Sequence, residues 1–523
     1  MENSKKKIVK YPVGDQSFES IRSNDNLYID KTQYIDKLVN GGGKYFFLGR
    51  PRRFGKSLLL STLQCFFEGK RELFKDTFIA STDWEWKKYP VLYLDLNIKK
   101  YKEEKDLDLV LDDLFSEWER LYGIEKKSDD FSLRFKGIIE GAYRASGDTP
   151  VVVLVDEYDK PLVNNLHDTK RFEHYRDKLG EIYSNFKSSA QYLRLVFITG
   201  ISRFAKLSVF SGLNNLNDIT FVDKYAAICG ITEKEFEDNF QEGLARLAEV
   251  GNTTPEVMHD KVKKHFDGYH FTDLCPDIYN PFSLMSLMEN EQFMNYWIDS
   301  GTPTVLWDQL KRFDVDLKSL LNSRADTKTL QGLDLENRNP VALLYQTGYL
   351  TIKKVIAPGM YQLGLPNEEV KDGFMAFLLP NYASLHGEST QFFIYDFVED
   401  LREGNVDAFM SRLQRMFADT TYEMHMDNER NLHNALYVFS LLLGMKTKAE
   451  YHTSNGRIDL FIETDRYYYI IEIKIDSTAQ AALDQINGKG YALPFQAEGR
   501  QIVKIGLIFD TKQRTLSDWI TEF

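Results

Sequence analysis

Residues 459–474 read DLFIETDRYYYIIEIK, a pattern that predicts two strands joined by a short turn. Side chains alternate between the two faces of a strand, so Glu472 and Lys474 lie on the same face. If residues 458–462 pair with the second strand as a hairpin, Asp459 reaches the same place. Two carboxylates beside an ammonium group are suited to bind Mg²⁺ and to activate a water molecule. The alternative is an exposed hairpin whose charged side chains form weak surface ion pairs.

The composition indicates a soluble globular protein of several domains. A chain of 523 residues is too long for one ordinary core, and its 43% hydrophobic and 27% charged residues are typical of globular proteins. No apolar run reaches the ~18 residues of a membrane span, and the N-terminus lacks the apolar core of a secretion signal. The three cysteines (Cys65, Cys229 and Cys275) form no metal-binding spacing, which favours a cytoplasmic location. A net charge of -13 argues against a surface coated for nucleic-acid binding but leaves room for a local basic groove.

The first third of the chain alternates apolar strands with helical segments, as in an α/β domain with a mostly parallel sheet. The predicted strands are residues 45–48, 91–96, 151–155 and 193–199, and a helix is predicted at 56–67. From about residue 205 to about residue 325 the pattern is helical, with periodic segments at 233–250, 254–265 and 281–321. A mixed connector follows, then helices over 396–444, and a last α/β unit begins near residue 446.

A second phosphate-binding motif lies between the first strand and its helix. A phosphate loop needs a strand, convergent backbone N–H groups, a lysine, and a hydroxyl for Mg²⁺ at the start of a helix. The usual spacing places a glycine at position 50, where this chain has Arg50. The alternative for the motif alone is a helix start after a tight turn. The predicted nucleotide-binding residues of the loop are Arg53, Phe54, Gly55, Lys56 and Ser57.

An acidic pair ends the apolar strand at 151–155. Asp156 is suited to hold Mg²⁺ together with Ser57, and Glu157 to orient the attacking water. At the end of the next strand, Thr199 is expected to hold the water near the γ-phosphate and Arg203 to contact that phosphate. The alternatives are a strand-capping role for Thr199 and a surface ion pair for Arg203. A loop followed by an acidic strand predicts ATP and Mg²⁺ as cofactors.

The stretches RPRRFGKS at 50–57 and DEYDKP at 156–161 closely resemble the bacterial AAA-ATPase-like family, whose members often carry a C-terminal PD-(D/E)xK nuclease-like domain. The resemblance runs from about residue 10 to about residue 510. The loop is similar to that of STAND-like P-loop ATPases, from which it departs at Arg50, and the departure leaves the approach of the backbone to the β-phosphate open. Further segments that resemble the family are 28–32, 213–216, 279–282, 347–350 and 366–370.

The resemblance also implies roles at the C-terminal hairpin. Asp459 and Glu472 would bind the metal, and Lys474 would assist the attacking water or the phosphate. Gln485 matches a glutamine that positions water or phosphate in related nucleases. Glu429 or Glu450 would supply a further acid, and Glu429 is preferred.

The implied fold class is α/β: a P-loop NTPase (ASCE/STAND-like) with a parallel sheet and a helical subdomain, followed by a small restriction-endonuclease-like α/β domain. The expected domains are 1–205, 206–330 (helical), 331–390 (connector) and 391–523 (nuclease-like). The expected function is a Mg²⁺-dependent ATPase fused to a nuclease acting on nucleic acid, DNA rather than RNA, with ATP binding gating access to the hairpin. The alternative is a signalling or scaffold ATPase whose C-terminal domain binds nucleic acid or protein without cleaving. No membrane partner is expected, and a homo-oligomer is left open.

Overall fold

The computed structural model describes residues 9–202, 208–210, 213, 215–299, 310, 316–332, 340–381, 390–418, 429–453, 456–496, 499–513 and 515–523. The chain divides into two compact units: unit 1 holds residues 1–301, 308–313 and 322–369, and unit 2 holds residues 302–307, 314–321 and 370–523. Within the described ranges, every helix is too short or too polar to traverse a lipid bilayer.

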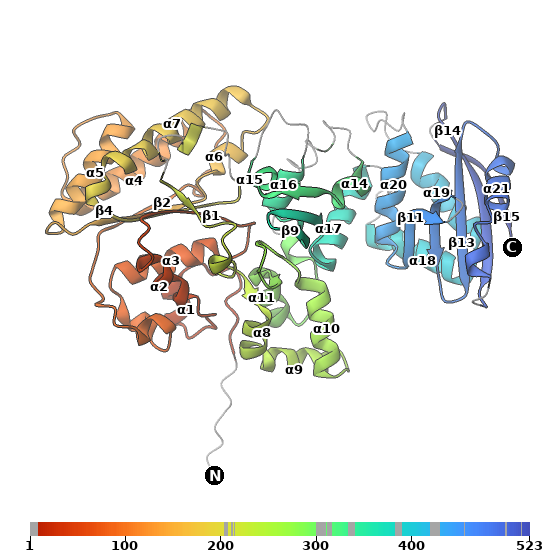
Figure 1. The fold of residues 1–523 in the computed structure, drawn as a ribbon, viewed down its shortest axis with the longest axis horizontal. Helices are drawn as coiled ribbons and strands as arrows, with labels where there is room; N and C mark the ends of the chain where they lie inside the picture. The colour runs from red at the N-terminus through yellow and green to blue at the C-terminus, as the bar shows by residue number, and fades with distance from the viewer. Residues whose placement is uncertain are drawn as a thin grey trace, which may run out of the picture. The chain divides into compact units, whose positions relative to one another are not determined.

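A five-stranded parallel sheet in the order β2-β3-β4-β1-β5 forms the centre of unit 1. Every residue of β3 is buried, as expected for a central strand that has helices on both faces. Helices α1 to α3 cover one face, and α4, α5 and α7 cover the other (Figure 1). The strands are β1 (Tyr45–Gly49), β2 (Val91–Asp95), β3 (Val151–Asp156), β4 (Leu193–Gly200) and β5 (Asn217–Asp218), and the helices are α1 (Phe18–Ser23), α2 (Thr32–Val39), α3 (Lys56–Phe67), α4 (Asp106–Tyr122), α5 (Phe131–Ala145), α6 (Lys160–Val163) and α7 (Thr169–Ser188). The predicted parallel α/β sheet is confirmed.

The strand order decides where the functional residues of unit 1 meet. β4 lies between β3 and β1, and all three strands run parallel. Parallel strands end at the same edge of a sheet, so the loop after β1 and the polar residues that end β3 and β4 are brought together. This edge is the place where ligands bind in open α/β sheets.

The helices that follow in unit 1 are α8 (Glu233–Asn239), α9 (Gln241–Val250), α10 (Pro255–Phe266), α11 (Pro281–Asn290) and α12 (Tyr296–Asp299). The helix predicted over 233–250 is two helices, because the chain turns at Phe240. A capping box of Thr232 and Glu235 begins α8, and the side chain of Asn280 caps α11 ahead of Pro281. The strand β6 (Ile231–Thr232), just before α8, pairs with β7 (Ile278–Tyr279), which lies between α10 and α11 in the chain.

A small antiparallel sheet lies within residues 324–364. In this region the sequence predicted only the end of the helical subdomain and a connector. The order of the sheet is β8-β10-β9, and two helices lie between β8 and β9 in the chain. The elements are β8 (Arg324–Asp326), α15 (Thr327–Gln331), α16 (Val341–Thr347), β9 (Thr351–Ala357) and β10 (Met360–Gly364).

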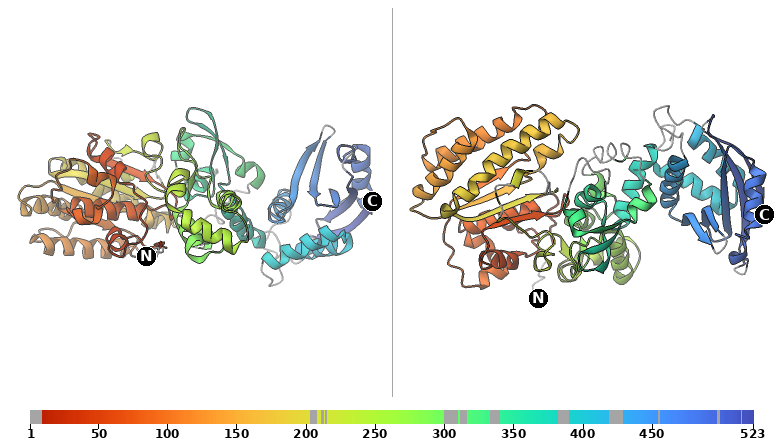
Figure 2. Two further views of the ribbon diagram at one scale, coloured as in Figure 1. Left: turned by 90° about the horizontal axis from the view of Figure 1, so that it is seen from below. Right: turned by 45° about the horizontal axis from the view of Figure 1, so that its top comes forward.

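Unit 2 is built on a second five-stranded sheet, in the order β11-β12-β13-β14-β15. Only β13 and β14 run parallel, because α21 connects them, and the other neighbours are antiparallel. Two views of these elements are given in Figure 2. The strands are β11 (Lys446–Thr453), β12 (Gly456–Glu463), β13 (Tyr467–Ile475), β14 (Gln501–Asp510) and β15 (Thr515–Glu522), and the helices are α14 (Leu317–Leu321), α17 (Glu368–Leu378, whose first two residues belong to unit 1), α18 (Thr390–Glu403), α19 (Val406–Ala418), α20 (Glu429–Leu442) and α21 (Ala479–Gly488).

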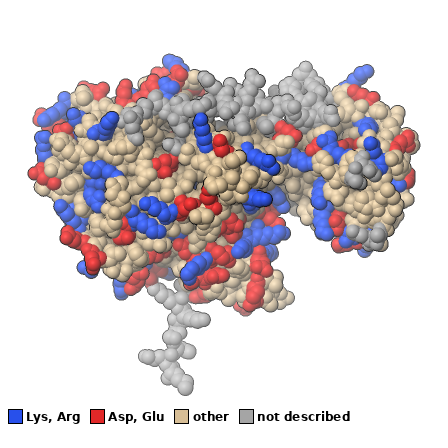
Figure 3. Space-filling model, viewed as in Figure 1, with Lys and Arg blue, Asp and Glu red and all other residues tan. Residues whose placement is uncertain are grey.

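The surface charge is mixed on the face shown in Figure 3, where lysine and arginine side chains alternate with aspartate and glutamate. The excess of acidic residues is therefore not gathered into one region of that face. Any contact with an anionic partner depends on a local cluster of basic side chains.

Candidate active sites

The loop between β1 and α3 carries the predicted phosphate-binding residues of unit 1. Gly55 has a φ of 91° and Arg53 a φ of 66°, so the chain turns through left-handed conformations just before α3 begins at Lys56. The free N–H groups at such a helix start attract anions. Lys56 is buried, and its Nζ donates to the carbonyl oxygens of Arg50 (3.0 Å) and Pro51 (2.9 Å). Its ammonium is thereby held inside the loop.

The end of β3 places a carboxylate at the same edge of the sheet. Asp156 is buried, and it accepts hydrogen bonds from the hydroxyl groups of Thr199 (2.6 Å) and Tyr93 (3.3 Å). The next residue, Glu157, has a left-handed φ of 48°, and its carboxylate lies 3.7 Å from Lys160 Nζ. The hydroxyl group of Thr199 therefore orients the carboxylate of Asp156. Arg203 lies outside the described residues.

Two further acids near Asp156 were missed in the sequence. Burial raises the pKa of Asp95, which ends the neighbouring strand β2, and the charges of Asp156 and Glu157 raise it further. Asp159 is buried and accepts the backbone N–H groups of residues 201 and 202, and burial raises its pKa to about 6. Asp95 could have been found as an acid that ends a strand beside β3. Asp159 could not, because its partners lie 42 and 43 residues further along the chain.

The hairpin of unit 2 has the predicted form. β12 and β13 are antiparallel, with Leu460 opposite Ile471, and the backbone N–H of Ile473 donates to Asp459 Oδ2 at 2.8 Å. The Glu472 side chain is only 3% exposed. The predicted pairing that brings Asp459 to the second strand is therefore confirmed.

Gln485 on α21 connects the two charged residues of β13. Its Nε2 donates to Glu472 Oε1, while its Oε1 accepts from Lys474 Nζ at 2.5 Å. Lys474 Nζ also lies 3.7 Å from Glu472 Oε1. The other oxygen, Glu472 Oε2, is buried without a hydrogen-bond partner in the described part of the chain. The structure thus brings Asp459, Glu472, Lys474 and Gln485 together.

The charge balance at this site suits a cation. Burial, followed by the charge of Asp459, raises the pKa of Glu472 to about 7, although Lys474 opposes the shift. Burial also raises the pKa of Asp459. One buried and one half-buried carboxylate, both with raised pKa values, are stabilised when a divalent cation shares their charge. The unpartnered Oε2 of Glu472 supplies an oxygen ligand of the kind that Mg²⁺ and Mn²⁺ prefer.

Comparisons with known proteins match two regions of the chain to protein families. Residues 12–210 match the family model described as a predicted AAA-ATPase, and residues 427–519 match the PD-(D/E)XK nuclease superfamily. An Azotobacter chroococcum mcd 1 protein, described as an uncharacterized protein in the vnfD 5′ region, is 33% identical over 529 residues. The similarity covers 98% of this chain and 99% of that protein. The chain belongs to the AAA-ATPase-like family. Proteins with these two kinds of domain generally use a nucleotide and a divalent metal ion.

The residue at position 50, where similar ATPases have glycine, is an anchor for the loop of this AAA-ATPase-like protein. The Arg50 side chain is buried and donates to the carbonyl oxygens of Gly49 (2.9 Å), Thr220 (2.9 Å) and Ala226 (3.1 Å). Its guanidinium also lies 4.3 Å from the ring centroid of Phe271. The side chain is therefore committed to the protein interior, and it ties the start of the loop to the segment after β5.

We expect Arg50→Ala to lower the free energy of unfolding of unit 1 by about 3 kcal/mol, because it leaves several buried carbonyl oxygens unpaired. Thermal unfolding followed by circular dichroism or differential scanning fluorimetry measures the change. Arg71→Ala, which removes an exposed arginine of the same unit, is the matched control. Equal stability of the two variants would contradict the anchoring role.

The other loop arginines stack on aromatic side chains of the protein. The guanidinium of Arg52 lies 4.7 Å from the ring of Trp297, and that of Arg53 lies 4.6 Å from the ring of Phe282. Trp297 is held in turn by Glu369, a buried acid that accepts its backbone N–H at 2.7 Å. The family-like segments at 279–282 and 366–370 thus contain residues that support the loop.

Two residues, Glu429 and Glu450, were considered as a further acid of the site at the hairpin of unit 2. Glu450 lies on β11, and the pairs on either side of it place it opposite Asp459 on β12. Its carboxylate is paired with Arg457 at 2.7 Å. Glu429 begins α20, and its side chain lies outside the described residues, so the preference for Glu429 stays untested.

Proposed function

We propose that the protein is a Mg²⁺-dependent ATPase joined to a nuclease that hydrolyses phosphodiester bonds of nucleic acid, with DNA favoured over RNA, in the cytoplasm. The observation that carries the proposal is the convergence of Asp459, Glu472, Lys474 and Gln485, with one buried carboxylate oxygen left unpartnered. The same chain holds a phosphate loop and an Asp-Glu strand. Together these features support two sites of phosphate chemistry.

In unit 1, the N–H groups at the start of α3 and the buried ammonium of Lys56 are placed to bind the phosphates of ATP. The half-buried hydroxyl of Ser57 and the carboxylate of Asp156 would hold Mg²⁺, which would neutralise charge on the phosphates. Thr199 and Tyr93 keep Asp156 in its orientation through their hydroxyl groups. Glu157 would accept a proton from the attacking water.

In unit 2, Asp459 and Glu472 would hold the divalent metal, which would lower the pKa of a bound water and polarise the phosphate. Gln485 fixes Glu472 Oε1 and Lys474 Nζ by donating to the first and accepting from the second. Lys474 would stabilise negative charge on the phosphate during attack. The buried position of Glu472 keeps bulk water from one side of the site.

The test is a pair of assays on the purified full chain. We expect ATP hydrolysis with Mg²⁺, and cleavage of single- or double-stranded DNA or RNA with Mg²⁺ or Mn²⁺ that EDTA abolishes. ATP hydrolysis without cleavage of any of these substrates would favour the alternative, a signalling or scaffold ATPase whose C-terminal domain only binds. Absence of ATP hydrolysis would contradict the role of unit 1.

The affinity of unit 2 for Mn²⁺ should depend on pH through Glu472. A metal ligand must be deprotonated, and this carboxyl group, with its pKa raised to about 7, is protonated below that value. The affinity should therefore rise by about tenfold per pH unit as the pH approaches 7 from below, and level off above it. Isothermal titration calorimetry of the full chain measures this, with Asp156→Asn used to remove the proposed metal site of unit 1. A flat profile, or one unchanged by Glu472→Gln, would contradict the assignment.

A further inference from the structure

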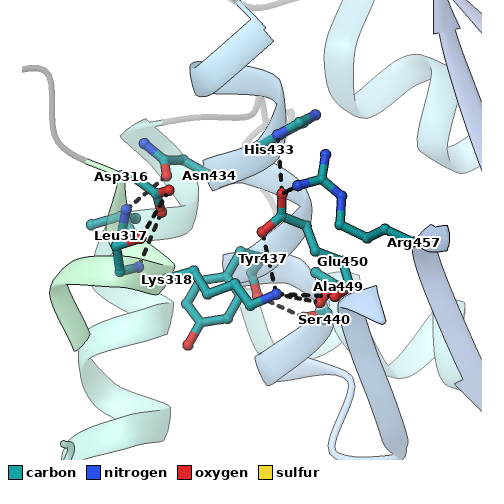
Figure 4. A network of polar contacts seen from close by, with 11 residues as sticks. Asp316, Leu317, Lys318, His433, Asn434, Tyr437, Ser440, Ala449, Glu450 and Arg457 are labelled. Carbon is teal, nitrogen blue, oxygen red and sulfur yellow. Dashed lines mark hydrogen bonds and ion pairs between the residues drawn. The ribbon is translucent and has the colours of Figure 1, made fainter. Parts of the chain in front are cut away.

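Three basic side chains from three different elements surround the carboxylate of Glu450 (Figure 4). Arg457 on β12 lies 2.7 Å from Glu450 Oε1, and His433 on α20 lies 3.7 Å from the same oxygen. Lys318 on α14 lies 3.2 Å from Glu450 Oε2. One carboxylate is thus in contact with three basic side chains, more than its single negative charge can neutralise. Clusters of basic side chains of this kind bind phosphate groups in proteins.

The helix that carries Lys318 is firmly seated on unit 2. The backbone N–H of Leu317 donates to Asn434 Oδ1 on α20 at 2.9 Å, and Leu317 is buried. Lys318 Nζ also donates to the backbone carbonyl oxygens of Ala449 (3.0 Å) and Glu450 (3.2 Å). These contacts fix the ammonium beside β11 (Figure 4). We call Lys318, His433 and Arg457 the basic cluster. Lys318 lies outside residues 427–519, so the region that matches the nuclease superfamily does not contain the whole basic cluster.

The cluster lies next to the carboxylates of the candidate nuclease site. The β11–β12 pairing puts Glu450 opposite Asp459, and Arg457 precedes Asp459 by two residues on β12. His433 and Arg457 are near enough to Asp459 for their charges to lower its pKa against the effect of burial. A nucleic-acid backbone that presents one phosphate to Asp459 and Glu472 would have a neighbouring phosphate within reach of this cluster.

Glu450 itself is held in an unfavourable backbone conformation. Its φ of 50° is left-handed, a conformation that is unfavourable for a residue with a side chain. The carboxylate is already occupied by basic partners, so it is poorly placed to serve as a metal ligand. A side chain whose position depends on these ion pairs can be displaced by a stronger anion.

We propose that Lys318, His433 and Arg457 form a binding site for a backbone phosphate of nucleic acid, and that the Glu450 carboxylate occupies this site when no nucleic acid is bound. The inference rests on the proposed action of unit 2 on nucleic acid. It assigns to a residue of α14 a direct part in substrate binding. Such contacts bind without reading sequence, and they weaken with salt.

The test measures binding apart from cleavage. Fluorescence anisotropy with labelled single- and double-stranded DNA and RNA, in EDTA, gives the affinity of the full chain and its salt dependence. We expect Lys318→Met and Arg457→Met each to weaken binding by about fivefold at low salt and to lower the slope of log K against log salt by about one. Glu450→Gln should strengthen binding by about threefold, a gain that misfolding cannot produce.

The chain offers a matched set of controls around Glu463, which lies on the same strand as Arg457. Glu463 on β12 accepts ion pairs from Lys446 (2.9 Å) and Arg500 (2.6 Å), away from Asp459. Lys446→Met, Arg500→Met and Glu463→Gln should leave the affinity within about twofold of the wild type. Lys318→Arg, which keeps the charge, should restore most of the binding lost in Lys318→Met.

The outcomes separate this inference from the proposed function. The expected pattern without any metal-dependent cleavage would support the phosphate site and refute the nuclease. Unchanged affinity in Lys318→Met and Glu450→Gln would overturn the phosphate site even if the protein cleaves. Wild-type protein that binds none of the oligonucleotides at low salt would overturn it as well. Loss of Mn²⁺ affinity in Glu450→Gln, without a gain in oligonucleotide affinity, would instead make Glu450 a metal ligand.

Discussion

Asp459→Asn should abolish metal-dependent cleavage, with a loss of at least about 10³-fold, which corresponds to about 4 kcal/mol of activation free energy. The amide oxygen can still accept the N–H of Ile473, which lies 2.8 Å from Asp459 Oδ2. The hairpin should therefore keep its shape while the metal loses an anionic ligand. Burial raises the pKa of Asp459, so its charged form destabilises the metal-free fold. The variant should consequently unfold at a temperature no lower than the wild type.

The combination of lost activity and retained stability is the informative result. Asp465→Asn, in the exposed turn of the same hairpin, is the matched control and should cleave at the wild-type rate. Cleavage is measured with a quenched fluorescent oligonucleotide and Mn²⁺, and metal binding by calorimetry. Full cleavage by Asp459→Asn would mean that the activity comes from another site or from a contaminant. A large drop in melting temperature would mean that Asp459 has a structural role.

The sequence was sufficient for the parts of the fold that rest on local pattern. The strand predicted at 151–155 was found because a short apolar run rich in β-branched residues is typical of a buried strand. The 459–474 hairpin was found because its alternation has a period of two. The sheet β8-β10-β9 was missed. In β9 the first two residues are buried and the others are mostly exposed, so the strand shows no alternation to detect. Its pairing with β10 also contains register shifts, which disturb the pattern further.

Some residues of the two sites could be predicted from local motifs, and others could not. Lys56, Asp156 and the Glu472–Lys474 pair stand in short motifs whose chemistry is visible in the sequence. Arg50 looked like an imperfection of the loop, because its partners Thr220 and Ala226 lie about 170 residues further along. Lys318 stood in a segment marked only as helical, and its contact with Glu450 spans 132 residues. Residues that act through such long-range contacts carry no local signal, so only the fold reveals them.

Lys56→Ala should remove ATP binding at unit 1, with a loss of at least about 100-fold in affinity. The ammonium is the buried cation of the loop, and it also holds the loop through the carbonyl oxygens of Arg50 and Pro51. Its loss removes charge from the phosphate site and a restraint from the loop that forms it. Binding of a fluorescent ATP analogue and release of phosphate measure the effect. Lys70→Ala, just beyond the other end of α3 and partly exposed, should bind ATP as the wild type does.

The same variant decides whether the two sites communicate. We expect ATP to change the rate of oligonucleotide cleavage in the wild type, because ATP binding is proposed to gate access to the hairpin of unit 2. A ligand shifts an equilibrium only through its different affinities for the two states, so a protein that cannot bind ATP should be insensitive to it. Lys56→Ala should therefore cleave at one fixed rate, different from that of the ATP-bound wild type. Equal cleavage by both proteins, with and without ATP, would make the two sites independent.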